Sequence, residues 1–197
     1  MTGDPARQAV SRGAGDPDLA DVVAAQSDRA AFGILYRRYL DRVYGYAFYL
    51  LGDHHDAEDA TERTFLAAFA AIGSFRDAGA SFRSWLFRIA HNQVANALRS
   101  RGRRAASALD GEDQPSGGLD PAAAVGAADD SRELRRALDG LSPDRRQVLV
   151  LRFVDGLTAR EIATVIGRSE GAVRVLQHRA LRELATMLDE GGFRPAV

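Results

Sequence analysis

Two closely spaced helix starts and a glycine turn mark the stretch from residue 141 to 188. Thr158 is followed three residues later by Glu161, the spacing of a capping box in which each side chain bonds the free backbone amide of the other residue. Gly167 suits the left-handed conformation of a sharp turn, and Ser169 suits the cap of a following helix. Because apolar residues recur at helical spacing around these signals, the stretch predicts a helix-turn-helix.

The helix after this turn, expected from Glu170 to about Met187, has two contrasting faces. Its apolar face consists of Val173, Leu176, Ala180, Leu181 and Leu184, and its polar face of Arg174, Gln177, His178, Arg179 and Arg182. Such a helix, following a short helix and a turn, has the geometry that enters the major groove of DNA, with its first residues at base edges and its later cations at phosphates. A plain helical hairpin with a solvated basic face is the alternative.

Helical spacing of apolar residues also dominates the first hundred residues. A short helix is expected after Asp18, a long one between Asp28 and about Leu51, a third over 54–72, and a fourth from Phe82 to about residue 100. The expected fold is therefore all-α.

The apolar faces of these helices indicate which residues form the core. The second helix places Tyr36 on its apolar face, and the fourth helix places Leu98 there. A further helix, with Pro143 at its first position, is expected to end near Asp155.

The third helix carries an unusual density of acidic residues in its first turns. These are Asp56, Glu58, Asp59 and Glu62. Acids near a helix N-terminus suit the helix dipole, which explains some of them. Four acids in seven residues exceed what capping requires, so we also consider a binding surface for a basic partner.

The fourth helix has an apolar face on one side and a polar face on the other. The polar face includes Arg88, Asn92, Asn96 and Arg99. An aromatic residue, Phe75, lies in the loop before it. Arginine can follow phosphates while amides and aromatic rings meet bases, so this face suits single-stranded nucleic acid. An ordinary solvated face is the alternative.

Charge and composition divide the chain into four parts. Residues 1–18 are rich in Gly, Pro and Asp, which indicates a disordered tail. Residues 19–104 and 131–197 each contain 12 arginines and 9 acidic residues, whereas residues 105–130 contain six acidic residues and no basic one. We therefore expect two helical domains, over 19–104 and 131–190, joined by a flexible acidic linker over 105–130.

Several classes of protein are disfavoured by composition. The chain has no cysteine, no apolar run long enough to cross a membrane and no hydrophobic signal core, so we expect a cytoplasmic protein. His54 and His55 point about a hundred degrees apart on a helix, which argues against a metal site. No catalytic motif or phosphate-binding loop is evident, so neither enzyme activity nor a cofactor is expected.

Four stretches, in order, resemble a bacterial RNA polymerase sigma factor of the extracytoplasmic function (ECF) group. They read AFGILYRRYLDRVYGYAFYLLGD, DAEDATERTFLAAF, FRSWLFRIAHNQVAN and LSPDRRQVLVLRFVDGLTAREIATVIGRSEGAVRVLQHRALREL. The resemblance implies that the first domain is region 2, which binds core polymerase and the −10 promoter element. It implies that the second domain is region 4, which binds the −35 element, and that the factor directs transcription initiation at specific promoters.

The resemblance also implies which residues meet each partner. The residues implied to bind the β′ clamp helices are Asp56, Glu58, Asp59 and Glu62. The residues implied to contact the −10 element are Arg76, Asp77, Ser81, Arg88, Asn92, Asn96 and Arg99. Those implied to contact the −35 element are Arg168, Ser169, Glu170, Gly171, Arg174, Gln177, His178 and Arg179. Further partners implied are the polymerase β flap and an anti-sigma factor that wedges between the domains.

Arg63 follows Glu62 where the family often carries Gln-Glu, which changes the charge offered to the clamp helices. Two other kinds of protein remain to be distinguished: a helical regulator that binds operators as a dimer, and a module that only sequesters another protein. A sigma factor needs polymerase to bind promoter DNA strongly, whereas an operator-binding dimer does not. The two basic faces argue against a module that only sequesters another protein.

Overall fold

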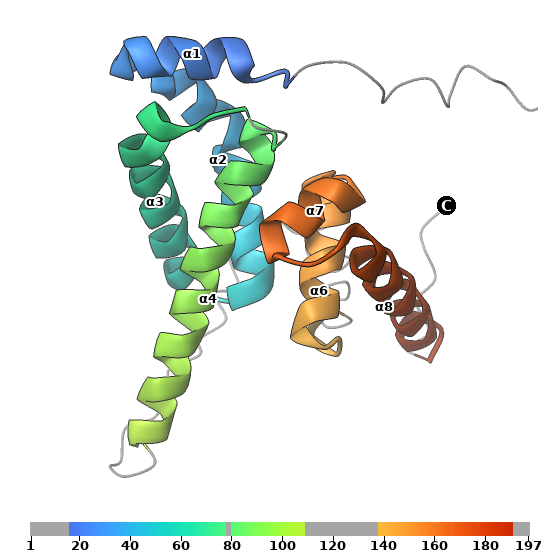
Figure 1. Ribbon diagram of the computed structural model, residues 1–197. Coiled ribbons are helices and arrows are strands. Elements are labelled where there is room, and N and C mark those ends of the chain that lie inside the picture. Colours follow the sequence, from blue (N-terminus) through green and yellow to red (C-terminus); the bar gives the residue numbers. More distant parts are fainter. Residues whose placement is uncertain (1–15, 78–79, 109–137, 191–197) are drawn as a thin grey trace, which may run out of the picture.

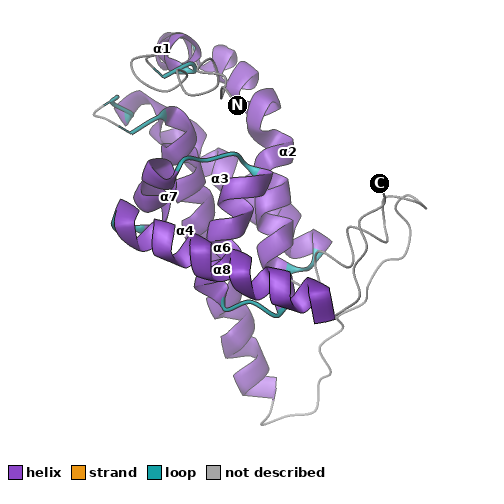
Figure 2. Ribbon diagram, turned by 90° about the vertical axis from the view of Figure 1, so that its right-hand side faces the viewer, coloured by secondary structure: helices purple, strands orange, loops and turns teal. Residues whose placement is uncertain are grey.

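The computed structural model describes residues 16–77, 80–108 and 138–190, and every element in these residues is helical (Figures 1 and 2). The expectation of an all-α fold is confirmed. The helices form two groups, which we call the N-terminal module (residues 16–108) and the C-terminal module (residues 138–190). The expected tail up to residue 15 and most of the expected linker lie outside the described residues.

The N-terminal module is a helical bundle with one helix laid across its end (Figure 1). Its elements are α1 (Leu19–Ser27), the 3-10 turn η2 (Arg29–Ala31), α2 (Phe32–Leu51), α3 (His54–Ala71), the 3-10 turn η3 (Ile72–Ser74) and α4 (Phe82–Ala108). Helices α2, α3 and α4 pack together, and Leu35, Leu86 and Phe87 are completely buried. Burial of these side chains is the main source of the bundle's stability.

Local signals set the helix ends in this module. Gly52 adopts the left-handed conformation, with φ of 76°, and ends α2. Asp53 then caps α3, because its side chain accepts a hydrogen bond of 2.8 Å from the Asp56 amide. Asp28 caps η2 rather than α2, through a bond of 2.9 Å from the Ala30 amide. The chain thus makes one tight turn before the long helix begins.

The C-terminal module is a helix-turn-helix preceded by one further helix. It contains α6 (Pro143–Leu149), the π-helical turn η4 (Val150–Val154), α7 (Ala159–Ile166) and α8 (Glu170–Glu190). The capping box of Thr158 and Glu161 is present, and Gly167 has a φ of 68°. The predicted helix-turn-helix is confirmed, although the helix expected to continue to Asp155 widens at residue 150 into the π turn.

Some side chains expected in the core are exposed, and some of the expected tail is packed. Leu98 and Leu181 are 44% and 40% exposed. Leu98 lies close to the level at which α2 ends. Arg101, three residues further along α4, donates a hydrogen bond of 3.1 Å to the carbonyl of Leu51, the last residue of α2. Helix α4 itself runs to Ala108, four residues into the expected linker, and Asp18 from the expected tail is only 3% exposed.

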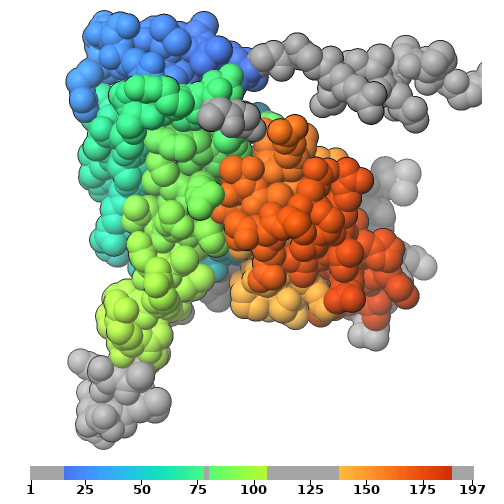
Figure 3. All heavy atoms as spheres, viewed as in Figure 1, coloured from blue at the N-terminus to red at the C-terminus, as the bar shows by residue number. Residues whose placement is uncertain are grey.

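The two modules dock against each other (Figure 3). Helix α7 packs on α4, and η4 packs on α2. Gln147 of α6 donates a hydrogen bond of 2.8 Å to the hydroxyl of Tyr46, which is completely buried in the docked chain. Helix α8 packs against α6 and α7, on the side of the C-terminal module that faces away from α4 (Figure 1).

Replacing Leu86 by alanine removes a fully buried side chain of α4 and should lower the free energy of unfolding by about 2–5 kcal/mol, because the cavity is refilled only in part. Urea denaturation followed by circular dichroism measures this. Leu98→Ala on the same helix is the matched control and should change stability by less than about 0.5 kcal/mol. Equal losses from the two variants would contradict the described core.

Candidate nucleic-acid interface

Residues predicted to meet the −10 element lie on one side of α4 and just before it. Arg88, Asn92, Asn96 and Arg99 follow one another at steps of four, four and three, so they share a helix face, and all four are exposed. Arg99 donates a hydrogen bond of 2.6 Å to the amide oxygen of Asn96. The face therefore carries two guanidinium groups and two amides over about three helical turns.

The remaining predicted −10 residues flank the start of α4. Arg76 is exposed and donates from one Nη1 atom to the carbonyls of Gly73, at 2.9 Å, and Phe75, at 2.8 Å. Asp77 is exposed too. Ser81 caps α4, since its hydroxyl accepts a hydrogen bond of 3.2 Å from the Ser84 amide. Backbone and cap contacts thus orient Arg76 and Ser81.

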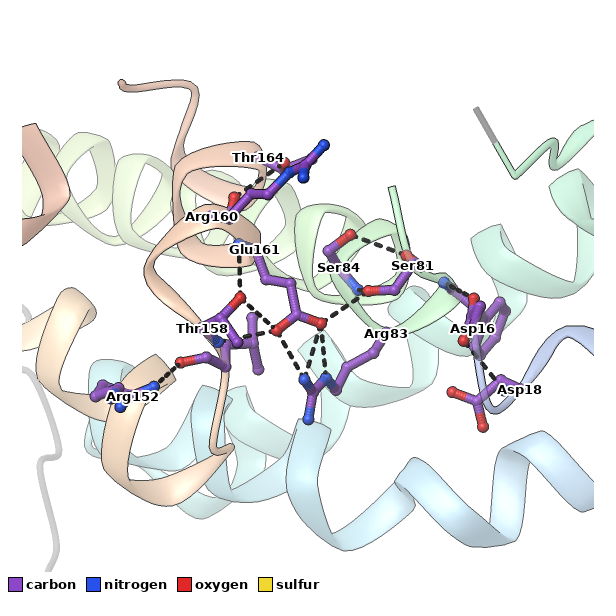
Figure 4. A network of polar contacts seen from close by, with 12 residues as sticks. Asp16, Asp18, Ser81, Arg83, Ser84, Arg152, Thr158, Arg160, Glu161 and Thr164 are labelled. Carbon is purple, nitrogen blue, oxygen red and sulfur yellow. Dashed lines mark hydrogen bonds and ion pairs between the residues drawn. The ribbon is translucent and has the colours of Figure 1, made fainter. Parts of the chain in front are cut away.

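A polar network joins this region to the helix-turn-helix (Figure 4). The Arg83 guanidinium contacts both carboxylate oxygens of Glu161, at 2.7 and 2.8 Å, and the Ser81 hydroxyl donates to the same carboxylate at 2.9 Å. Glu161 still accepts from the Thr158 amide at 2.8 Å. Burial alone would raise the pKa of Glu161, but hydrogen bonds from Arg83, Thr158 and Ser81 lower it below its ordinary value.

Further contacts of the docked modules involve the polar face of α4. Arg88 donates a hydrogen bond of 3.2 Å to the carbonyl of Thr164 in α7. His91 is half-buried and bonds the side chain of Gln147 through Nδ1. Burial and the nearby Arg88 charge lower the pKa of His91. Docking therefore engages Ser81 and Arg88, two of the residues predicted to contact DNA.

Asp155 is buried at the junction of the modules. It is 2% exposed, and neither carboxylate oxygen has a hydrogen-bonding partner among the described residues. Burial raises its pKa to about 8, even though Arg42 of α2 and Arg83 of α4 oppose the rise. Because both of these cations belong to the N-terminal module, the environment of Asp155 depends on docking.

Residues predicted to meet the −35 element cluster at the start of α8. Ser169 caps the helix by accepting from the Ala172 amide at 3.2 Å. Arg174 is 70% exposed and pairs with Glu170 at 2.6 Å. A side chain at Gly171 would meet no atom within 4 Å, so the surface there is open.

The other four predicted −35 residues surround this cluster. Arg168 forms an ion pair with Asp144 of α6. His178 and Arg179 are exposed, and Gln177 is half-buried. Helix α8 therefore presents arginine, histidine and glutamine side chains along an outward face, while Val173 and Ala180 are buried beneath it.

The acidic residues of α3 divide into two pairs. Glu58 and Glu62 are exposed and line a groove between α2 and α3. Asp56 and Asp59 are half-buried, and neither belongs to the groove lining. Arg63, the departure from the family pattern, forms an ion pair of 3.2 Å with Asp59. The Arg63 charge is thus directed to its own helix.

The groove contains residues that the sequence analysis missed. Its lining adds Asp41 to the acidic rim and includes the exposed side chains of Tyr36 and Leu66, which are 40% and 60% exposed. Tyr36 was expected in the core because it follows the apolar spacing of α2. Asp41 directly follows Leu40, which also lines the groove. A search for acidic residues beside the apolar face of α2 would therefore have found it.

The two modules match known families separately. Residues 35–104 match Sigma-70 region 2, and residues 131–184 match Sigma-70, region 4. Among curated proteins, the ECF RNA polymerase sigma factor BldN of Streptomyces coelicolor is 38% identical over 185 residues, which cover 91% of this chain and 70% of BldN. The RNA polymerase sigma factor CarQ of Myxococcus xanthus is 35% identical over 165 residues, covering 81% and 90%.

Solved structures agree with these matches. CnrH in complex with the cytosolic domain of CnrY superposes with a TM-score of 0.68 at 27% identity, over 88% of this chain and 97% of CnrH. The sigma factor RpoE in complex with the anti-sigma factor NepR from Bartonella quintana gives 0.67 at 28% identity, over 80% and 96%. The chain belongs to the ECF group of RNA polymerase sigma factors, which act in promoter-specific transcription initiation. Among the described helices, none is long and apolar enough to span a membrane.

The stability of the fold should decrease as the pH rises from 6.5 to 8. The pKa of Asp155 is raised in the folded chain, so folding takes up a proton, and the stabilisation present below the ordinary value of 3.8 is lost as the pH rises to about 8. His91 acts oppositely: its pKa is lowered, so it opposes folding only as the pH falls below its ordinary value of 6.5. Between 6.5 and 8 the contribution of Asp155 therefore dominates.

Urea denaturation at several pH values between 6.5 and 8 measures this. The free energy of unfolding of the wild type should fall by at most about 1.4 kcal/mol per pH unit. Asp155→Asn should lose this dependence, because its side chain carries no titratable carboxyl. An unchanged slope in Asp155→Asn would refute the assignment.

Proposed function

We propose that this chain recognises promoters through two separate arginine-bearing faces, one on each module. The outward face of α8 binds the −35 element, and the segment from Arg76 to Ser81 with the polar face of α4 binds the −10 element. The observation that carries the proposal is the placement of Arg174 beside an open Gly171 on the helix-turn-helix of a Sigma-70 region 4 domain. Arginine donates two parallel hydrogen bonds to guanine, which suits sequence readout in the major groove.

Core polymerase, in this proposal, binds the groove between α2 and α3. An acidic rim of Asp41, Glu58 and Glu62 beside exposed Tyr36 and Leu66 offers both charge and apolar area to the β′ clamp helices. Asp56 and Asp59 extend the negative charge along α3. The C-terminal module binds the β flap, to which Phe153, 63% exposed on η4, offers an apolar contact.

Binding of the −10 element requires the modules to separate at the contact between α4 and α7. The hydroxyl of Ser81 and the guanidinium of Arg88 bond α7 in the docked arrangement and are released when it opens. Relatives such as RpoE have been solved with an anti-sigma factor. An anti-sigma factor of this chain would keep the two modules from engaging polymerase and DNA together. The protein acts in the cytoplasm, and the chemistry of transcription belongs to the polymerase.

Run-off transcription with bacterial core polymerase tests the whole proposal. Specific transcripts that require both the chain and core polymerase support it. Binding of promoter duplex by the chain as a dimer, without any polymerase-dependent transcript, would contradict it and favour an operator-binding regulator.

Glu62→Arg should weaken binding to core polymerase by about tenfold or more, because it places a cation in the acidic groove where a basic partner docks. Fluorescence anisotropy of labelled chain titrated with core polymerase measures the affinity. Asp139→Arg is the charge-matched control: Asp139 lies on the C-terminal module and pairs with Arg146 at 2.9 Å. Equal effects of the two variants would show that net charge, rather than the groove, determines affinity.

Arg174→Ala and Arg179→Ala should weaken promoter binding by the holoenzyme in different ways. Loss of a bidentate base contact at Arg174 should cost about 1–3 kcal/mol and relax specificity at one −35 position. Loss of a phosphate contact at Arg179 should weaken binding to all −35 sequences equally. It should also reduce the slope of log affinity against log salt concentration by about one. Filter binding to a set of single-base −35 variants at several salt concentrations distinguishes them. Identical behaviour of the two variants would refute these roles.

A further inference from the structure

The N-terminal stretch from Asp16 to Ser27 precedes the residues that match region 2, yet its side chains reach both ends of the segment proposed to bind the −10 element. The side-chain amide of Gln26 donates two hydrogen bonds, each of 3.0 Å, to the carbonyls of Ile72 and Phe75. Phe75 directly precedes Arg76. Gln26 therefore holds the backbone where the segment begins.

Asp16 holds the other end. Its carboxylate accepts a hydrogen bond of 2.5 Å from the backbone amide of Phe82, the first residue of α4 and the one that follows Ser81. This amide is one of the four at a helix start that lack a partner within the helix. Ser81 satisfies the Ser84 amide, so α4 has a local cap and a second cap contributed from 66 residues away.

Asp16 is itself fixed in place. Its second oxygen accepts from the Asp18 amide at 3.0 Å. The buried side chain of Asp18 accepts from the Tyr39 hydroxyl and from Arg38, the latter at 2.5 Å. Tyr39 also packs edge-on against Phe82, with ring centroids 5.8 Å apart. The cap on Phe82 is thus tied to α2 through a chain of short contacts.

Aromatic packing joins the two held ends. The rings of Phe75 and Phe82 meet edge-on at 5.9 Å, and Trp85 contacts both rings, at 5.3 and 5.6 Å. Such contacts resist separation of the ends but leave their backbone direction free to vary. The hydrogen bonds of Gln26 and Asp16 supply that direction, because each requires a particular orientation of a carbonyl or an amide.

We infer that Asp16 and Gln26 are positioning residues for promoter strand capture: they fix the backbone at Phe75, next to Arg76, and at Phe82, next to Ser81, and so orient the described residues proposed to receive an unpaired base. The inference rests on the proposed −10 role of Arg76, Asp77 and Ser81. A pocket for an extruded base tolerates little displacement of its walls, so loss of either contact reduces base recognition rather than overall binding.

The test uses holoenzyme and single-stranded oligonucleotides that carry the non-template −10 sequence of a promoter it transcribes. A parallel set carries one abasic site at each position. Wild-type holoenzyme is expected to prefer the intact strand over one abasic strand by about tenfold, the size of one stacked base. Asp16→Ala and Gln26→Ala should reduce that preference to less than about threefold while binding the abasic strand as the wild type does.

Two variants serve as controls. Asp16→Asn keeps an acceptor oxygen and should restore the preference. Asp21→Ala lies in the same stretch, where Asp21 pairs with Arg38 at 2.7 Å, and should leave the preference unchanged. Thermal unfolding of each variant is measured alongside.

The outcomes separate the inference from the proposed function on which it rests. If the wild type prefers the intact strand and both alanine variants keep that preference, or lose affinity equally for intact and abasic strands, the inference is overturned and the two residues are only structural. If the wild type shows no preference at any position, the proposed −10 role of the segment fails first.

Discussion

The carboxylate of Glu161 is shared between folding of the helix-turn-helix and docking of the modules. Hydrogen bonds from Thr158 orient it as half of a capping box, and the same oxygens meet the guanidinium of Arg83. Because the cap fixes the carboxylate on α7, the cation of α4 encounters a preorganised acceptor and loses little freedom on pairing. The position of α7 on α4, and with it that of the whole C-terminal module, depends on this ion pair and on the apolar contacts around it.

The docked arrangement treats the two proposed DNA-binding faces unequally. Ser81 and Arg88 on the N-terminal module are engaged by α7, whereas Arg174 and Arg179 on α8 remain exposed. On the proposed assignment of these faces, docking leaves the residues for duplex recognition exposed and engages two of the residues for strand capture. This ordering agrees with the chemistry of initiation, in which a duplex must be located before any base is unpaired. Asp155 lies at the same junction, where burial raises the pKa of its carboxyl to about 8.

Much of the fold followed from local signals. The capping box of Thr158 and Glu161, the turn at Gly167 and the end of α2 at Gly52 depend on residues within a few positions of one another, and all were predictable. Tertiary relations were not: the partner of Glu161 is 78 residues away, and the exposure of Leu98 depends on where another helix ends. Asp16 illustrates the same limit, since composition placed it in a disordered tail and only the folded chain brings it to α4. For the site, spacing predicted the shared face of α4 but assigned the groove residue Tyr36 to the core.

Docking takes place between two parts of one polypeptide, so it is a unimolecular equilibrium. Dilution does not shift it, and the factor is in the same state when a cell holds few copies as when it holds many. A competitor must instead exceed the local concentration that the covalent connection imposes, which for tethered modules is commonly in the millimolar range. A partner that contacts both modules at once meets this demand more easily than two separate ligands, because its second contact is intramolecular as well. If activity requires the modules to separate, as proposed, the length of the connection between them helps to set the concentration of partner that is needed.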